Sequence, residues 1–187
     1  MSAPTLSHHR QAHAPVDDAF DVLDACHREM VVALDKMSAL IARIETAGTD
    51  AQAQSMASEL LAFFSTTVRQ HHEDEERHVF PRMATDSDAE TVQAVLRLQQ
   101  DHDWLEEDWM ELSPHLAAIA AGQTWWEIES LRDGVTVFSA LLRDHIALEE
   151  SLIYPQARER LQGRQRRDMG REMAARRRAT RGQANTR

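Results

Sequence analysis

Hydrophobic and polar positions follow the period of an amphipathic α-helix over four long stretches of the chain. Apolar residues recur three and four positions apart in each stretch, which places them on one face of a helix. Gly48 and Gly122 stand where two of these helices are expected to end. We therefore predict an all-α protein. Its predicted helices cover residues 16–46, 50–83, 88–120 and 124–156, with a shorter basic helix near 157–178.

The connections between the four long helices are short, so consecutive helices are expected to lie antiparallel in an up-down four-helix bundle. Pro114 should bend or interrupt the third helix, because it lacks an N–H and its ring clashes with the preceding turn. The predicted domain organisation is a flexible leader at residues 1–15, the bundle at 16–156, and a basic C-terminal helix or tail with a disordered end at 157–187.

Each long helix carries a histidine within the apolar stripe that is expected to face the core, and in two helices a glutamate follows four residues later. These residues are His27, His71, Glu75, His102, His145 and Glu149. The pattern His-x-x-x-Glu-Glu-x-x-x-aromatic-Pro occurs at residues 71–81 and again at 145–155. The chain is therefore predicted to contain two related helix hairpins, each with one lone histidine and one His-x-x-x-Glu pair.

A buried carboxylate needs a partner, because an isolated charge in an apolar core is costly. A network of His–Glu ion pairs could supply one, but it gives no reason for the repeated pattern. A metal cation neutralises the carboxylates and accepts the imidazole lone pairs, and residues four apart on a helix can point at one centre. Helix-bundle cores are a known place for such carboxylate–histidine sites. The pattern thus predicts a metal site.

Imidazole and carboxylate ligands without a matching thiolate favour iron or manganese, with zinc as a further alternative. If both glutamates bridge, an oxide or hydroxide joins the ions and Glu106 also ligates, the ligand count reaches about what two six-coordinate ions require, and without Glu106 open positions remain for a small ligand. Glu106, four residues after His102, is a candidate additional ligand and equally a candidate solvent-facing residue. We therefore expect two ions rather than one.

The register of the second helix has an alternative. His72 and Glu76 have the same spacing as His71 and Glu75. The repeat, in which the histidine stands ten residues before the proline, favours His71 and Glu75. The remaining polar residues are then supporting or surface groups, namely His72, Glu73, Glu76 and Glu150.

The charge distribution and the cysteine content indicate which partners and which cellular compartment to expect. The net charge is −10, yet 11 of the 21 basic residues are arginines beyond residue 157. Such a basic helix can fold back on the acidic body, or Arg164–Arg181 can act as an interaction module for an acidic partner, nucleic acid or a membrane surface. The single cysteine, Cys26, excludes an internal disulfide and fits a reducing compartment. Since no apolar run has membrane-spanning length and no secretory signal is visible, we expect a cytoplasmic protein.

With these residues in place, the sequence resembles the hemerythrin family in its bacterial His-His-Glu cation-binding form. The resemblance covers roughly residues 16–178 and rests on the six stripe residues together with Phe80-Pro81 and Tyr154-Pro155. It implies a non-heme, usually di-iron centre inside a four-helix bundle, where dioxygen, nitric oxide or peroxide can meet the metal.

The chain departs from the oxygen-carrying members of that family, which have His-x-x-x-His on the third helix and His-x-x-x-x-Asp on the fourth. Here Glu106 follows His102, and Glu149 follows His145 with Glu150 at the next place. An anionic carboxylate in place of a neutral imidazole should stabilise the oxidised, ferric pair. Reversible dioxygen carriage is therefore not the favoured function.

The leading hypothesis is a cytoplasmic, non-heme di-iron protein that binds or senses dioxygen, nitric oxide or peroxide, rather than a dedicated enzyme. The alternatives are a di-iron enzyme that reduces peroxide or nitric oxide, and an interaction module acting through the basic tail. Nucleic acid is not an expected partner, and a homodimer is left open because the tryptophans could pack a dimer face. Cys26 and Tyr154 are interpreted as buried packing residues.

Overall fold

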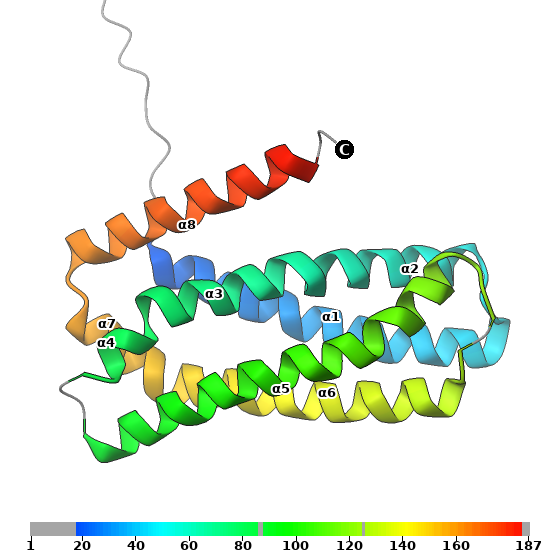
Figure 1. Cartoon of the computed structure of the whole chain (residues 1–187), viewed down its shortest axis with the longest axis horizontal. Helices are drawn as coiled ribbons and strands as arrows, with labels where there is room; N and C mark the ends of the chain where they lie inside the picture. Colours follow the sequence, from blue (N-terminus) through cyan, green and yellow to red (C-terminus); the bar gives the residue numbers. More distant parts are fainter. Residues whose placement is uncertain (1–17, 86–87, 125, 185–187) are drawn as a thin grey trace, which may run out of the picture.

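The computed structural model describes residues 18–85, 88–124 and 126–184, which are helical apart from short connections and contain no strand. The predicted all-α fold is thereby confirmed. Figure 1 shows long helical rods side by side and a further helix along one side of them. This arrangement is compatible with the expected four-helix bundle, whose antiparallel up-down order stays a prediction. The leader predicted at residues 1–15 lies outside the described residues, and none of the described helices is long and apolar enough to cross a membrane.

The observed helices follow the predicted ranges closely. The first predicted helix is α1, Ala19–Ala47, and the third is α5, Ala89–Ala120. The second consists of α2, Ala51–Ala62, the π-helical turn η1, Phe63–Val68, α3, Arg69–His78, and the short α4, Phe80–Met83. The fourth consists of α6, Ile128–Leu148, the π-helical turn η2, Glu149–Ile153, and α7, Tyr154–Arg160. The basic helix is α8, Gly163–Ala184, which lies six residues further along the chain than predicted.

Local side-chain chemistry sets the helix ends. Asp18 accepts a hydrogen bond from the backbone N–H of Phe20 at 3.1 Å, and so caps the start of α1. Asp50 caps α2 in the same way. Gly48 and Gly122 have φ values of 70° and 69°, a left-handed conformation that glycine adopts without strain. The helix ends predicted at these two glycines are confirmed.

Pro114 does not interrupt α5, which continues through it to Ala120. The proline is exposed, whereas Leu112 and Leu116 on the opposite side of the helix are buried. Figure 1 shows the direction of α5 changing over its last turns. The loss of one backbone hydrogen bond therefore bends this helix without ending it.

A polar layer divides the core into two apolar clusters. The larger cluster, here called the distal cluster, includes Leu34, Leu60 and Phe138. The smaller one, here called the proximal cluster, includes Phe20 and Val95. The two clusters follow one another along the helices, and the histidines and glutamates predicted as ligands stand between them. The fold therefore encloses this polar layer between two sets of apolar side chains.

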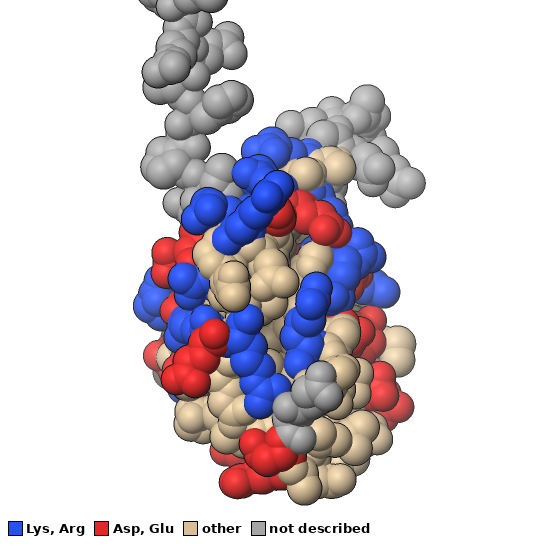
Figure 2. Space-filling model, turned by 90° about the vertical axis from the view of Figure 1, so that its left-hand side faces the viewer, with Lys and Arg blue, Asp and Glu red and all other residues tan. Residues whose placement is uncertain are grey.

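α8 covers the proximal cluster. Its Met169 and Met173 are buried in that cluster, and Arg166 pairs with Asp18 of the bundle at 3.2 Å. Figure 2 shows basic side chains gathered on the end of the molecule where α7 and α8 meet. The basic helix thus folds back on the acidic body, which is the first of the two interpretations of the charge distribution.

Candidate metal centre

The six residues predicted as ligands from the apolar stripes are all buried in the polar layer. None of them is more than 5% exposed. They come from α1 (His27), α3 (His71 and Glu75), α5 (His102), α6 (His145) and η2 (Glu149). The structure therefore brings together side chains that lie far apart in the sequence.

The donor atoms form two groups that share one carboxylate. The first group is His27, His71, Glu75 and Glu149, and the second group is His72, Glu75, His102 and His145. Within each group the donor atoms lie within 4.8 Å of one another. Ligands bound at about 2.0–2.2 Å on opposite sides of one ion are about 4 Å apart. Each group therefore has the spacing that one cation needs.

Both glutamates lie between the two groups. Glu75 Oε1 is 3.2 Å from His71 Nε2, while its Oε2 is 3.5 Å from His102 Nε2. Glu149 Oε2 is 3.1 Å from His27 Nε2 and 3.3 Å from His145 Nε2. Each carboxylate thus faces one histidine of each group, as a bridge between two ions requires.

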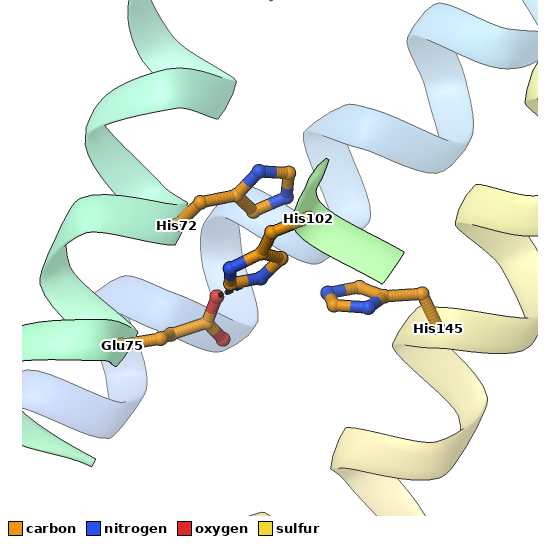
Figure 3. Close-up of side chains that lie close together, drawn as sticks. All are labelled: His72, Glu75, His102 and His145. Atoms are coloured by element: carbon orange, nitrogen blue, oxygen red, sulfur yellow. Dashed lines mark ion pairs between the residues drawn. The ribbon is translucent and has the colours of Figure 1, made fainter. Parts of the chain in front are cut away.

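The fifth imidazole belongs to His72, which the sequence offered only as part of the alternative register with Glu76. Figure 3 shows His72 converging with Glu75, His102 and His145, and its ring stacks on that of His102 with centroids 4.0 Å apart. Glu106, the candidate additional ligand, belongs to neither group. Its side chain is 49% exposed and lies 3.9 Å from Arg69.

The register of the second helix accounts for His72. The π-helical turn η1 ends immediately before α3, and such a turn adds a residue and shifts the face that later residues present. His71 and His72 both reach the polar layer, one in each group, whereas Glu76 is 49% exposed. His72 stands three residues before Glu75, a spacing that also places two residues on one helical face. This spacing between His72 and Glu75 was the signal in the sequence that could have identified His72 as a candidate ligand.

Carboxylates outside the groups hold the imidazole rings by their second nitrogen. Glu150 Oε1 lies 3.1 Å from His27 Nδ1, and Glu76 Oε1 lies 2.8 Å from His102 Nδ1. Asp101, which is buried, lies 3.8 Å from His145 Nδ1. The two shorter contacts fix the ring orientation of His27 and His102 and keep the Nε2 lone pair directed inward, whereas Asp101 is too far from His145 for a hydrogen bond. Glu76 and Glu150 thus contact imidazole rings of the two groups from outside them.

Several buried nitrogen and oxygen atoms of the two groups lack a hydrogen-bond partner among the described residues. They include Nε2 of His72, His102 and His145, Oε2 of Glu75, and both carboxylate oxygens of Glu149. Leaving such atoms unpaired is costly, and two carboxylates this close cannot both stay charged without a cation. Accordingly, burial and the negative charge of Glu75 raise the pKa of Glu149 well above its ordinary value. The donor set fits metal ions that prefer imidazole and carboxylate ligands.

Burial favours the neutral form that a metal needs in His27, His72 and His145 by lowering their pKa, whereas nearby carboxylates raise the pKa of His71 and His102. Burial and the neighbouring His71 lower the pKa of His27 to about 3, and burial lowers the pKa of His145. Burial also opposes the charged form of His71, but the Glu75 carboxylate outweighs it and raises the pKa of His71 to about 10. A cation that takes over Glu75 removes that effect, and neutral imidazole then binds the metal.

Two residues interpreted as packing residues contact the polar layer. The Tyr154 hydroxyl donates a hydrogen bond to Glu75 Oε1 and lies 3.2 Å from His27 Nε2. Cys26 is buried beside His71, whose pKa its thiol helps to raise. Cys26 is a small buried residue as expected, whereas Tyr154 packs and also presents its hydroxyl to the site.

Comparison with known proteins agrees with this donor set. The sequence model of the hemerythrin HHE cation-binding domain matches residues 18–157. The chain belongs to this family. A curated Haemophilus influenzae protein described as uncharacterized is 28% identical to it over 167 residues, which is 89% of this chain and 94% of that protein. The resemblance seen in the sequence is thereby confirmed, and the histidine–glutamate cluster identifies a metal-binding, hemerythrin-like protein.

Proposed function

We propose that the polar layer holds two iron ions and that the protein binds or senses a small oxidant, namely dioxygen, nitric oxide or peroxide. The observation that carries this proposal is the pair of four-membered donor groups that share Glu75. Five imidazoles and two carboxylates suit iron, while manganese and zinc take similar ligands. When bound, a pair of iron ions supplies a redox-active centre at which such oxidants react. An oxide or hydroxide bridge would complete the coordination.

The protein's own residues supply position and shielding. Glu75 and Glu149 keep the two groups together, and Glu76 and Glu150 hold two of the imidazole rings. The distal and proximal clusters keep bulk water from both sides of the layer. The single buried cysteine is consistent with the proposed cytoplasmic location.

A small pocket beside the second group supports the proposal that the ligand is a small molecule. It is a cavity of about 20 Å³ lined by Phe64, Trp109 and His72, with the exposed residues Arg69 and Glu106 also in its wall. Such a cavity has room for about one water-sized molecule. A diatomic molecule or peroxide fits this size, and a larger organic substrate does not.

The experiment that tests the proposal is metal analysis of protein produced in iron-supplemented medium. We expect about two iron ions per chain and the optical spectrum of bridged ferric iron. The variant His71→Ala with His145→Ala should lose the metal, whereas His78→Ala, which changes a histidine outside both groups, should keep it. Less than about one ion per chain, unchanged in the double variant, would contradict the proposal. Steady-state turnover of peroxide or nitric oxide would favour the enzyme alternative.

A further inference from the structure

The two halves of the site are related by the sequence repeat, but one aromatic position differs. Phe80 and Tyr154 are the aromatic residues of the two repeats. Phe80 stacks on His102 at 5.3 Å between centroids, and Tyr154 stacks on His27 at 5.1 Å. The two rings therefore play the same packing role, and Phe80 shows that this role needs no hydroxyl.

The hydroxyl of Tyr154 lies among the donor atoms of the first group. Tyr154 is fully buried, and its hydroxyl contacts Glu75 Oε1 and His27 Nε2. Both of those atoms face the position of the first ion. The partners of this hydroxyl are donor atoms of the first group, so the hydroxyl lies within the donor set and not in the apolar packing around the ring.

The two groups also differ in their number of imidazoles. The second group has three, because His72 joins His102 and His145. The residue of the second repeat that corresponds to His72 is Ile146, so the first group has only His27 and His71. The half that lacks the third imidazole is the half that has the phenol.

We propose that the Tyr154 hydroxyl oxygen is a ligand of the first ion, in the place that His72 takes for the second. The inference rests on the proposed function, since it requires ions in the two groups. With both glutamates bridging, each ion then has five protein ligands. The first ion gains a hard oxygen ligand, which suits its ferric state.

The proton balance of this ligation is simple. Glu75 Oε1 accepts the phenolic hydrogen bond, and it would become a ligand when the ion binds. The phenolic O–H bond then breaks, the oxygen–metal bond forms, and the proton leaves to solvent, as metal binding releases protons from other acidic ligands. No electrons are transferred in this step.

The test uses the fact that Tyr154 is the only tyrosine of the chain. The iron-loaded protein should show a visible tyrosinate-to-ferric charge-transfer band and phenolate modes in its resonance Raman spectrum. Both signals should disappear in Tyr154→Phe, a variant whose ring has a precedent at Phe80. Circular dichroism and iron content should stay close to those of the parent protein.

A second measurement avoids iron altogether. Loading the metal-free protein with Ga³⁺ should produce the near-ultraviolet difference spectrum of an ionised tyrosine in the parent protein, and none in Tyr154→Phe. Protein that binds about two iron ions per chain but shows neither tyrosinate signal would overturn this inference and leave the proposed function intact. Protein that binds no metal would overturn both.

Discussion

The two apolar clusters hold the same helices together by different means. In the distal cluster the described core is apolar side chains packed against one another. The proximal cluster adjoins the polar layer and is covered by α8, whose arginines reach buried Asp74, the residue before Glu75, which belongs to both donor groups. The distal half can therefore be stable by burial alone, whereas the site half needs ions and ion pairs to offset the cost of its buried charges.

The largest difference between the halves should appear when the metal is removed. Chelation should lower the free energy of unfolding by more than about 4 kcal/mol, since a ligand at a thousand times its Kd stabilises by this amount. Denaturant unfolding with and without chelator measures the loss. Hydrogen exchange should become faster in α3 and η2 first, while amides around Leu34 stay protected. Equal acceleration in both halves would remove the distinction.

A cavity made by mutation in the distal cluster should lower the free energy of unfolding whether or not metal is bound. Leu34 is fully buried, and Leu34→Ala should lower the free energy of unfolding by about 2–5 kcal/mol. The loss should be the same before and after chelation. Val32→Ala on the same helix is the matched control, because Val32 is 66% exposed and its truncation should cost less than about 0.5 kcal/mol. A loss confined to the metal-free protein would contradict the prediction.

The contact between α8 and Asp74 should stabilise the part of the molecule that contains the polar layer and the proximal cluster, and should leave the distal cluster unaffected. Asp74 is buried and pairs with Arg176 and Arg177, which are about one quarter exposed. Asp74→Asn removes the carboxylate that both arginines share, while Arg176 keeps its ion pair with Glu172. The variant should cost about 2 kcal/mol, below the range for fully buried pairs because water screens the arginines. Thermal unfolding measures it, and Glu73→Gln, at an exposed neighbour, is the control. If the melting temperature of Asp74→Asn equals that of the parent protein, α8 is held on the bundle by the burial of Met169 and Met173.

The supporting carboxylates should tune metal affinity more than stability. Glu76 lies 2.8 Å from His102 Nδ1, and Glu76→Gln keeps the shape while removing the charge. Metal affinity should fall by about 10–100-fold, as it does for other partners of metal-bound histidines. Competition with a chromogenic chelator measures the change, and Glu107→Gln, at an exposed residue of α5, should have no effect.

The smallest effect concerns the far end of the distal half, where Asp50 caps α2. A hydrogen bond from Arg43 and the backbone N–H of Ala53 lower its pKa from 3.8 to about 2. Because the folded pKa lies below the unfolded one, the stabilisation is complete above pH 3.8 and is lost as the pH falls through 2. Melting temperatures of the parent protein and Asp50→Asn should differ at pH 6 and converge in acid. If the difference in melting temperature stays the same at all pH values, ionised Asp50 does not stabilise the fold in the way proposed.

The helices and most of the site could be predicted because they depend on local periodicity. The stripe that contains His27 or His102 is visible in the sequence, and the repeat singles out Glu75 and Glu149. His72 lies one position off the stripe that was read for the second helix, and its three-residue spacing from Glu75 was not used as a signal. Glu106 has the right spacing from His102, but spacing does not show which turn of α5 approaches the other helices.

Contacts between distant parts of the chain left no local signal. The hydroxyl that distinguishes Tyr154 from Phe80 meets atoms of α1 and α3, and Arg176 meets Asp74 from more than a hundred residues away. Such pairs depend on how helices are placed side by side. The antiparallel order of the bundle, the iron and the oxidant accordingly stay predictions to be measured.

The position of Arg176 in α8, after every helix that carries a candidate ligand, has a consequence for biosynthesis. During translation, α1 to α6 leave the ribosome before the helix that neutralises Asp74. The nascent chain can pack its distal leucines early, but Asp74, next to Glu75, stays without its guanidinium partners until α8 has been made. Loading of the ions is therefore expected to be completed only after α8 has docked on the bundle.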